Sequence, residues 1–263
     1  MMVRLLLLML LILNSFSVQA ELVGEDVDYY SGETLMKGYI VYDDTFRGKR
    51  PAVLVVHEWW GHNDYARERA RQLAQLGYVA MAVDMYGDGK QAKHPEDARR
   101  FSAEVSGDIA LGKRRFMAAM DHLKIHKLVN KKMMAAIGYC FGGSVVLNMA
   151  REGIDLRGVV SFHGNLATKR FATPGSIKAR VMVAHGGEDP FVPALQVTNF
   201  LNEMNKTGVD YKFIVYGGAK HAFTNPGASS YGARYNLPLE YNEKADRDSW
   251  NDMEIFLKDV FNE

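Results

Sequence analysis

The sequence has few of the residues that cross-link a chain or give it a strong charge. It contains a single cysteine, which excludes a disulfide within the chain. Its 32 basic and 31 acidic side chains leave a formal net charge of +1. This balance indicates neither a nucleic-acid-binding face nor a polybasic membrane patch. The sequence also contains no internal repeat, low-complexity tract or sustained heptad pattern. The lone thiol, Cys140, is therefore either a buried inert group or a reactive one.

Long hydrophobic runs are also absent, apart from one at the N-terminus. Arg4 precedes an unbroken apolar run at residues 5–13, and a Val-Gln-Ala cleavage site follows at residues 18–20. This pattern predicts a secretory signal peptide over residues 1–20, because the run is shorter than the ~20 residues that span a bilayer. An uncleaved anchor or a buried N-terminal helix is the alternative. We expect residues 21–263 to form one exported domain, secreted or periplasmic, without a membrane anchor after cleavage.

Short apolar runs alternate with helical patterns along the rest of the chain. The run Ala-Val-Leu-Val-Val-His at residues 52–57 is typical of a strand buried on both faces. The predicted strands are 27–30, 35–42, 52–57, 78–83, 133–137, 156–162, 179–185 and 210–216. The predicted helices are 63–76, 95–105, 108–127, 142–151, 193–207 and 241–261. The alternation predicts an α/β fold with a mostly parallel sheet and helices on both faces. Reactive groups of such a fold lie beyond the carboxyl ends of its strands.

The strongest motif is Gly-Tyr-Cys-Phe-Gly-Gly at residues 138–143, between a predicted strand and a predicted helix. It has the pattern of the nucleophile elbow of α/β-hydrolases, with Cys140 in place of serine. The strained turn requires small residues two positions before and after the nucleophile, and Gly138 and Gly142 meet that requirement. The helix N-terminus favours a thiolate at Cys140. A glycine-rich turn around a structural cysteine is the alternative.

A nucleophile of this kind needs a base and an acid that orients it. In α/β-hydrolases the order along the chain is nucleophile, acid, histidine. Asp189 and His221 each follow the end of a predicted strand in that order. Glu188 is the competing acid, and we favour Asp189 because its shorter side chain precedes Pro190, which stiffens the loop.

The other histidines suggest less. His94, His122 and His126 fall in or beside predicted helices, and we expect them to be solvated or structural. His163 and His185 end strands. They either have only a packing role or support the catalytic residues.

The segment His-Glu-Trp-Trp-Gly-His at residues 57–62 follows another strand end. Its spacing is not H-E-x-x-H and it does not lie on a helix, so it predicts no zinc site. An α/β-hydrolase places the second half of its oxyanion hole here. We assign the two donors to the backbone N–H groups of Trp59 and Phe141. Trp59 and Trp60 either wall the substrate pocket or belong to the core.

Together these residues resemble the dienelactone hydrolase family. The likeness runs from about residue 35 to the C-terminus. Its motifs are Gly-Tyr-Cys-Phe-Gly-Gly at 138–143, His-Glu-Trp-Trp-Gly at 57–61, Gly-Glu-Asp-Pro at 187–190 and His-Ala-Phe-Thr-Asn-Pro at 221–226.

The resemblance implies an α/β-hydrolase that cleaves esters or lactones through a Cys140–Asp189–His221 triad and a thioester intermediate. It implies that Glu58 helps to govern the thiol-to-thiolate switch of the cysteine. The reaction needs no metal and no organic cofactor, and the expected partner is a small-molecule ester or lactone. We place Trp60, Tyr86 and Asn225 in the substrate pocket.

The sequence departs from family members that act on dienelactone, which hold the substrate carboxylate with two arginines. Aligned outward from the motifs, these positions are Asp88 and Asn225. An aspartate repels a carboxylate, so dienelactone itself fits poorly as a substrate. Other positive charge near this point comes from Lys90, Lys93, Arg99 and Arg100, for which a solvated helix face is the expected role.

Two readings of a different class remain open. One is a non-catalytic binding protein on a hydrolase scaffold, although such a scaffold has no need of a complete triad. The other is a thiol redox sensor, although the chain has no second cysteine to resolve a sulfenic acid. A thioesterase or a dehalogenase is a variant of the hydrolase hypothesis. No sequence pattern indicates an oligomeric state.

Overall fold

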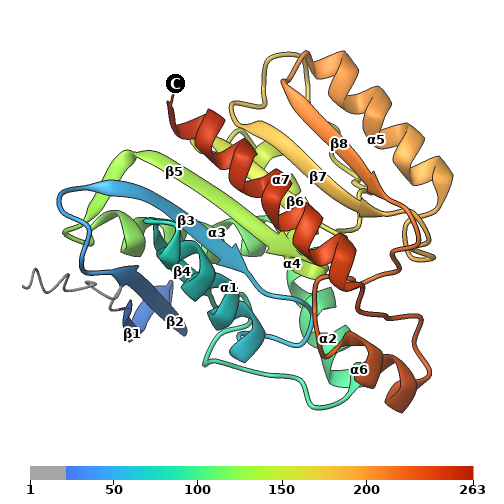
Figure 1. The fold of residues 1–263 in the computed structure, drawn as a ribbon, viewed down its shortest axis with the longest axis horizontal. Coiled ribbons are helices and arrows are strands. Elements are labelled where there is room, and N and C mark those ends of the chain that lie inside the picture. The colour runs from blue at the N-terminus through green and yellow to red at the C-terminus, as the bar shows by residue number, and fades with distance from the viewer. Residues whose placement is uncertain (1–21, 263) are drawn as a thin grey trace, which may run out of the picture.

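The computed structural model describes residues 22–262 (Figure 1), and the predicted signal peptide lies outside the described residues. The strands are β1 (Leu22–Ser31), β2 (Thr34–Asp43), β3 (Arg50–Val56), β4 (Val79–Val83), β5 (Val129–Tyr139), β6 (Gly158–Phe162), β7 (Arg180–Gly186) and β8 (Tyr211–Tyr216). The helices are α1 (Asp64–Gln75), α2 (Pro95–Gly107), α3 (Ile109–Lys124), α4 (Phe141–Arg151), α5 (Ala194–Thr207), α6 (Ala228–Tyr235) and α7 (Glu243–Asn262). Every predicted strand and helix is present, with ends shifted by a few residues.

The strands form one sheet in the order β1-β2-β4-β3-β5-β6-β7-β8. β1 and β2 pair antiparallel, as do β2 and β4, and all the other pairs are parallel. This confirms the predicted α/β-hydrolase fold with a mostly parallel sheet.

Both faces of the sheet are buried, which explains the unbroken apolar runs. Along β3, Leu54 and Val56 pack into the core on one face, and Val53 and Val55 into the core on the other. This alternation follows from the two-residue period of a strand. Helices α1 and α7 cover one face, and α3, α4 and α5 cover the other (Figure 1). Within residues 22–262, no helix is long and apolar enough to cross a bilayer.

The sheet places the reactive segments at one point of its edge. β3 has β4 on one side and β5 on the other, so the chain changes direction of winding between β3 and β5. Ligands of open α/β sheets bind at such a switch point, beyond the carboxyl ends of the strands. Here the ends of β3 and β5 lead into residues 57–62 and into Cys140.

Helix α6 was not predicted from the sequence. Its segment, Ala-Ser-Ser-Tyr-Gly-Ala-Arg-Tyr, has only eight residues, and of these only Ala228 and Gly232 are buried. A Cβ on Gly232 would lie 2.4 Å from the Leu239 carbonyl oxygen. The helix therefore depends on close packing against the loop that directly follows it. The Tyr235 hydroxyl donates to the Lys93 carbonyl over 2.9 Å and ties α6 to the segment before α2.

Candidate active site

Cys140 occupies a strained turn between β5 and α4. Its backbone has φ 53° and ψ −113°, in the region that non-glycine residues rarely adopt. A Cβ on Gly138 would lie 2.1 Å from the Gly142 carbonyl oxygen, and one on Gly142 would lie 2.2 Å from the Val56 carbonyl oxygen. The two glycines are therefore required by close backbone contacts, as the spacing of the motif predicted.

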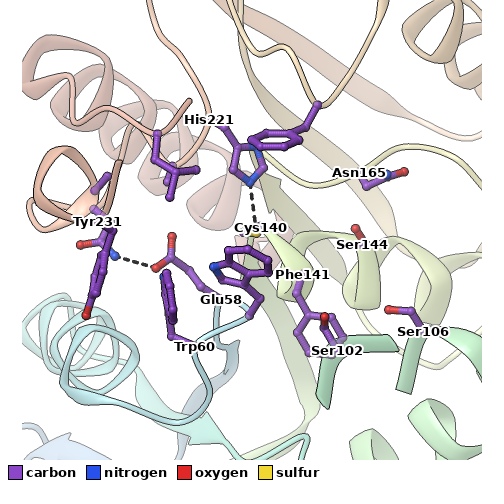
Figure 2. A pocket seen from close by; sticks show the side chains of 16 residues that line it. Glu58, Trp60, Ser102, Ser106, Cys140, Phe141, Ser144, Asn165, His221 and Tyr231 are labelled. Atoms are coloured by element: carbon purple, nitrogen blue, oxygen red, sulfur yellow. Dashed lines mark hydrogen bonds between the residues drawn. The ribbon is translucent and has the colours of Figure 1, made fainter. Parts of the chain in front are cut away.

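Cys140, His221 and Asp189 lie in a hydrogen-bonded line (Figure 2 shows the first two). The Cys140 Sγ is 3.1 Å from His221 Nε2, and His221 Nδ1 is 2.8 Å from Asp189 Oδ2. The other Asp189 oxygen accepts the Phe191 N–H at 2.8 Å, which orients the carboxylate. Glu188, the competing acid, is exposed. The structure thus brings together the three residues that the sequence placed in the triad, from the ends of β5, β7 and β8.

The electrostatic surroundings of His221 favour its protonated imidazole. Burial lowers the pKa of His221, but the adjacent Cys140 and the hydrogen-bonded Asp189 outweigh it, and the pKa is raised overall. A protonated imidazole here places a positive charge 3.1 Å from the Cys140 Sγ.

Glu58 is buried in the wall of the same site. Its Oε2 accepts a hydrogen bond of 2.6 Å from Asn225 Nδ2, drawn in Figure 2. Burial raises the pKa of Glu58 to about 7, against the opposing effects of Asn225, His221 and Arg69. Glu58 is therefore a carboxyl group that changes charge near neutral pH.

The backbone N–H groups of Trp59 and Phe141 are free to bind an oxyanion. Both residues line the cavity at Cys140, and neither N–H donates to a protein acceptor within residues 22–262. Phe141 opens α4, where the first N–H groups have no partner within the helix. His57 fixes the other donor loop, because its Nδ1 lies 2.5 Å from the Glu58 carbonyl oxygen while its Nε2 accepts the Met85 N–H over 3.2 Å.

His163 has a contact that the sequence did not reveal. Its Nδ1 accepts the Cys140 N–H at 3.1 Å, and its Nε2 lies 2.7 Å from Thr224 Oγ1. The Cys140 N–H is shared with the Phe162 carbonyl at 3.0 Å. The position of His163 at a strand end was the only available signal, and it did not separate this residue from His185, which packs against Phe213.

A cavity of about 250 Å³ opens at Cys140. Trp60 and Asn225 line it, as predicted. Tyr86 does not: it is 2% exposed, and its hydroxyl donates to the Trp59 carbonyl over 3.0 Å. Its ring packs behind Phe141, with 5.4 Å between centroids. Tyr86 thus lies behind the lining residue Phe141, and its assignment to the substrate pocket stays a prediction.

Tyr231 is a lining residue that the sequence analysis missed. It reaches the cavity from the unpredicted helix α6 and stacks on Trp60, with 4.5 Å between ring centroids. No sequence pattern connected the two residues, because the stack forms only when α6 packs against the loop after β3.

Asp88 and Asn225 stand at the two positions where family members that act on dienelactone carry arginine, and only one of them lies at the cavity. Asn225 lies in the cavity, whereas Asp88 is exposed, with its N–H bonded to the Leu35 carbonyl over 2.7 Å. The four basic residues named above are all exposed, and none lines the cavity: Lys90, Lys93, Arg99 and Arg100. Residues 22–262 also contain no group of three or more His, Cys, Asp or Glu side chains arranged to hold a metal.

Comparison with known proteins shows the family of the chain. The model of the dienelactone hydrolase family matches residues 36–261. Protein usf of Aquifex pyrophilus is 28% identical over 242 residues, which cover 90% of this chain and 99% of the relative. A protein of Aquifex aeolicus, provisionally named carboxymethylenebutenolidase, is 30% identical over 77% of this chain and 88% of its own.

Two solved structures are similar over nearly the whole fold. The dienelactone hydrolase-like promiscuous phosphotriesterase P91, from metagenomic libraries, is 35% identical with a TM-score of 0.84, over 92% of this chain and 100% of its own. The structure called m3DLH is 37% identical with a TM-score of 0.86, over 91% and 99% of the two chains. The chain belongs to the dienelactone hydrolase family of α/β-hydrolases.

Proposed function

We propose that this enzyme cleaves carboxylic ester or lactone bonds with Cys140 as the nucleophile, Asp189 and His221 as its acid and base, and a thioester intermediate. The observation that carries the proposal is the 3.1 Å contact between Cys140 Sγ and His221 Nε2, continued by the 2.8 Å contact to Asp189. Membership of the dienelactone hydrolase family shows that the chain is a hydrolase of lactones or esters.

In the first half of the reaction the thiolate attacks the carbonyl carbon, and a C–S bond forms. The carbonyl oxygen becomes negative and accepts hydrogen bonds from the Trp59 and Phe141 N–H groups. The intermediate then collapses, the C–O bond to the leaving group breaks, and His221 gives its proton to the departing alkoxide.

In the second half His221 takes a proton from water, and the resulting hydroxide attacks the thioester carbon. The C–S bond breaks, the acid is released and the Cys140 thiolate is restored. Asp189 holds the imidazole in the tautomer that both halves need, because its carboxylate fixes Nδ1–H. Glu58 takes the role of adjusting charge near the sulfur, since its own ionisation lies near neutral pH.

The nucleophile is tested with p-nitrophenyl acetate, by release of p-nitrophenol and by intact mass. We expect an acetyl adduct on the wild type that is absent from Cys140→Ala, and loss of turnover in His221→Ala. A thioester adduct can lie only on Cys140, because this is the sole thiol of the chain. His185→Ala is the matched control, since His185 also ends a strand but packs against Phe213. Equal release from the wild type and Cys140→Ala would exclude this nucleophile and favour the binding-protein reading.

We also propose that the enzyme acts outside the cytoplasm, after cleavage behind Ala20. The support is the N-terminal pattern of a charge, an apolar run and a small-residue cleavage site.

A further inference from the structure

Among the described lining residues of the cavity at Cys140, only His221 can carry a positive charge, and its imidazole is already paired with Asp189 and Cys140. The cavity lining contains no lysine and no arginine within the described residues, and the ionisable lining groups are Glu58, Cys140, His221 and Tyr231. A buried carboxylate of a substrate would therefore have no permanent positive partner there. Burial of an unpaired charge is strongly unfavourable.

The buried guanidinium of Arg69, whose charge acts on Glu58, is already paired with other groups. The positive charge of Arg69 acts to lower the pKa of Glu58. Its guanidinium donates hydrogen bonds of 2.5 Å to the Asp246 carboxylate and to the Thr224 carbonyl. Arg69 does not line the cavity. It cannot clamp a substrate without giving up a buried ion pair whose two side chains are 6% and 14% exposed.

The one carboxyl group of the wall adds repulsion. Glu58 lies beside Trp60 and faces the cavity (Figure 2). Asn225, which supplies its hydrogen bond, carries no charge, so the negative charge of an ionised Glu58 is not cancelled by its partner. An anionic substrate would meet this charge at close range.

The rest of the lining is apolar or neutral. Trp60 and Tyr231 lie on one side of Cys140, and small neutral polar side chains lie on the other, as Figure 2 shows. The aromatic lining residues are Trp59, Trp60, Phe141, Phe191 and Tyr231, and the aliphatic ones are Ala222, Ala228 and Leu239. The neutral polar ones are Ser102, Ser106, Ser144, Asn165 and Asn225.

We propose that the natural substrate is an uncharged ester or lactone with a largely apolar body, and that the site selects against substrates that carry a carboxylate. The proposal rests on the proposed function, since it concerns the same reaction at Cys140. We assign the selection to two residues. Glu58 repels the substrate carboxylate. Asn225 bonds Glu58 but is neutral, so it does not cancel the charge of Glu58 as a cationic side chain at this position would.

The test compares two esters of the same shape, 4-acetoxybenzamide and 4-acetoxybenzoate, at pH 8. Each value of kcat/KM is divided by the rate constant for hydroxide-catalysed hydrolysis of that ester, which removes the difference between the leaving groups. We expect a preference of at least about 30-fold for the benzamide, the order expected for an uncompensated charge beside a carboxylate. Equal values, or a preference for the benzoate, would overturn the proposal. A preference for 4-(trimethylammonio)phenyl acetate over the benzamide would overturn it too, because the site would then select a cation.

Substitution of Asn225 locates the selection. Asn225→Arg should reduce the preference for the benzamide at least about tenfold, because a guanidinium cancels the charge of Glu58 and pairs with the benzoate. Asn225→Gln is the matched control, which keeps an amide and adds length, and it should keep the preference. An unchanged preference in Asn225→Arg would remove Asn225 from the explanation.

The two possible failures are distinguishable. If the proposed function fails, Cys140→Ala hydrolyses the esters as well as the wild type does. If only the present inference fails, hydrolysis of both esters depends on Cys140, but the benzoate reacts as fast as the benzamide.

Discussion

At the scale of single residues, two buried histidines hold the backbone around the reacting groups. His57 bonds the carbonyl of Glu58 and so fixes the loop that carries the Trp59 N–H. His163 accepts the N–H of Cys140 itself. Burial lowers the pKa of both histidines. They therefore remain neutral, and His163 keeps the lone pair on Nδ1 that its contact with Cys140 requires.

The role of His163 is open to test by substitution. His163→Phe keeps a ring of similar volume but removes both hydrogen bonds, and we expect kcat to fall about tenfold with KM little changed. The effect is limited because the Phe162 carbonyl still accepts the Cys140 N–H. Steady-state kinetics with p-nitrophenyl acetate measure the effect, and His185→Phe serves as control. A change in KM alone would assign His163 to substrate binding instead.

Glu58 predicts a pH dependence of stability. Burial raises its pKa from the ordinary value of 4.5 to about 7 in the folded protein. Between these values the unfolded chain loses the proton while the native state retains it, so stability falls as pH rises from about 4.5 to about 7. Glu58→Gln removes this loss of stability. We expect the free energy of unfolding of the variant, relative to that of the wild type, to be about 2–3 kcal/mol higher at pH 8 than at pH 4.5.

Urea unfolding at the two pH values measures this difference. Glu33→Gln, in the exposed turn between β1 and β2, controls for the loss of one carboxylate. A constant difference between Glu58→Gln and the wild type would show that Glu58 ionises alike in the folded and unfolded states. The titratable groups whose charges act on Glu58 in the folded state, or on which it acts, are His221, Arg69, Tyr65, Tyr139 and Tyr231.

At the scale of elements, the junction of β5 and α4 determines where the sulfur lies. The helix begins directly after the nucleophile, and its first turn passes the end of β3 so closely that Gly142 has no space for a side chain. Phe141, the first residue of this helix, and Trp59, from the loop after β3, line one cavity. The glycines thus serve the packing of α4 on the sheet and the geometry of the site together.

Gly142→Ala should therefore destabilise the protein by at least about 2 kcal/mol, because a Cβ at that position requires the backbone of β3 to move. Gly107→Ala, where a Cβ meets no atom within 4 Å, should change stability by less than about 1 kcal/mol. Thermal and urea unfolding of the two variants decide the matter. Equal stability of both would mean that the elbow can relax without cost.

At the scale of the whole molecule, the sheet begins almost where the predicted signal peptide ends. β1 starts at Leu22, two residues after Ala20, and pairs along its full length with β2. Cleavage behind Ala20 would remove no residue of the sheet. The exported chain would retain every element that positions the triad.

Expression of the full chain in a Gram-negative bacterium tests this proposal. We expect the periplasmic fraction to contain a protein whose mass starts at Glu21, and Ala20→Arg to block processing, because the cleavage site requires a small residue. Ser17→Thr, outside the small-x-small pair, is the control. A cytoplasmic protein of full length would contradict the proposed export.

Much of this protein was determined by short stretches of sequence. The apolar runs define the strands, since both faces of a parallel sheet are buried, and the glycines around Cys140 define the elbow, since the turn excludes side chains. The order of Cys140, Asp189 and His221 was readable because each follows a strand, and parallel strands bring their carboxyl ends to one edge.

The remaining features were decided by tertiary structure. Helix α6 has only eight residues, and nothing in so short a segment indicates that Tyr231 packs against Trp60. Tyr86 follows a strand end as Glu58 does, yet Tyr86 packs behind Phe141 and Glu58 lines the cavity. His163 and His185 both lie at strand ends, and the strand order determines which one reaches Cys140, because β6 pairs with β5 and β7 does not. Local sequence sets the backbone path, but which side chains meet at its ends depends on how distant segments pack.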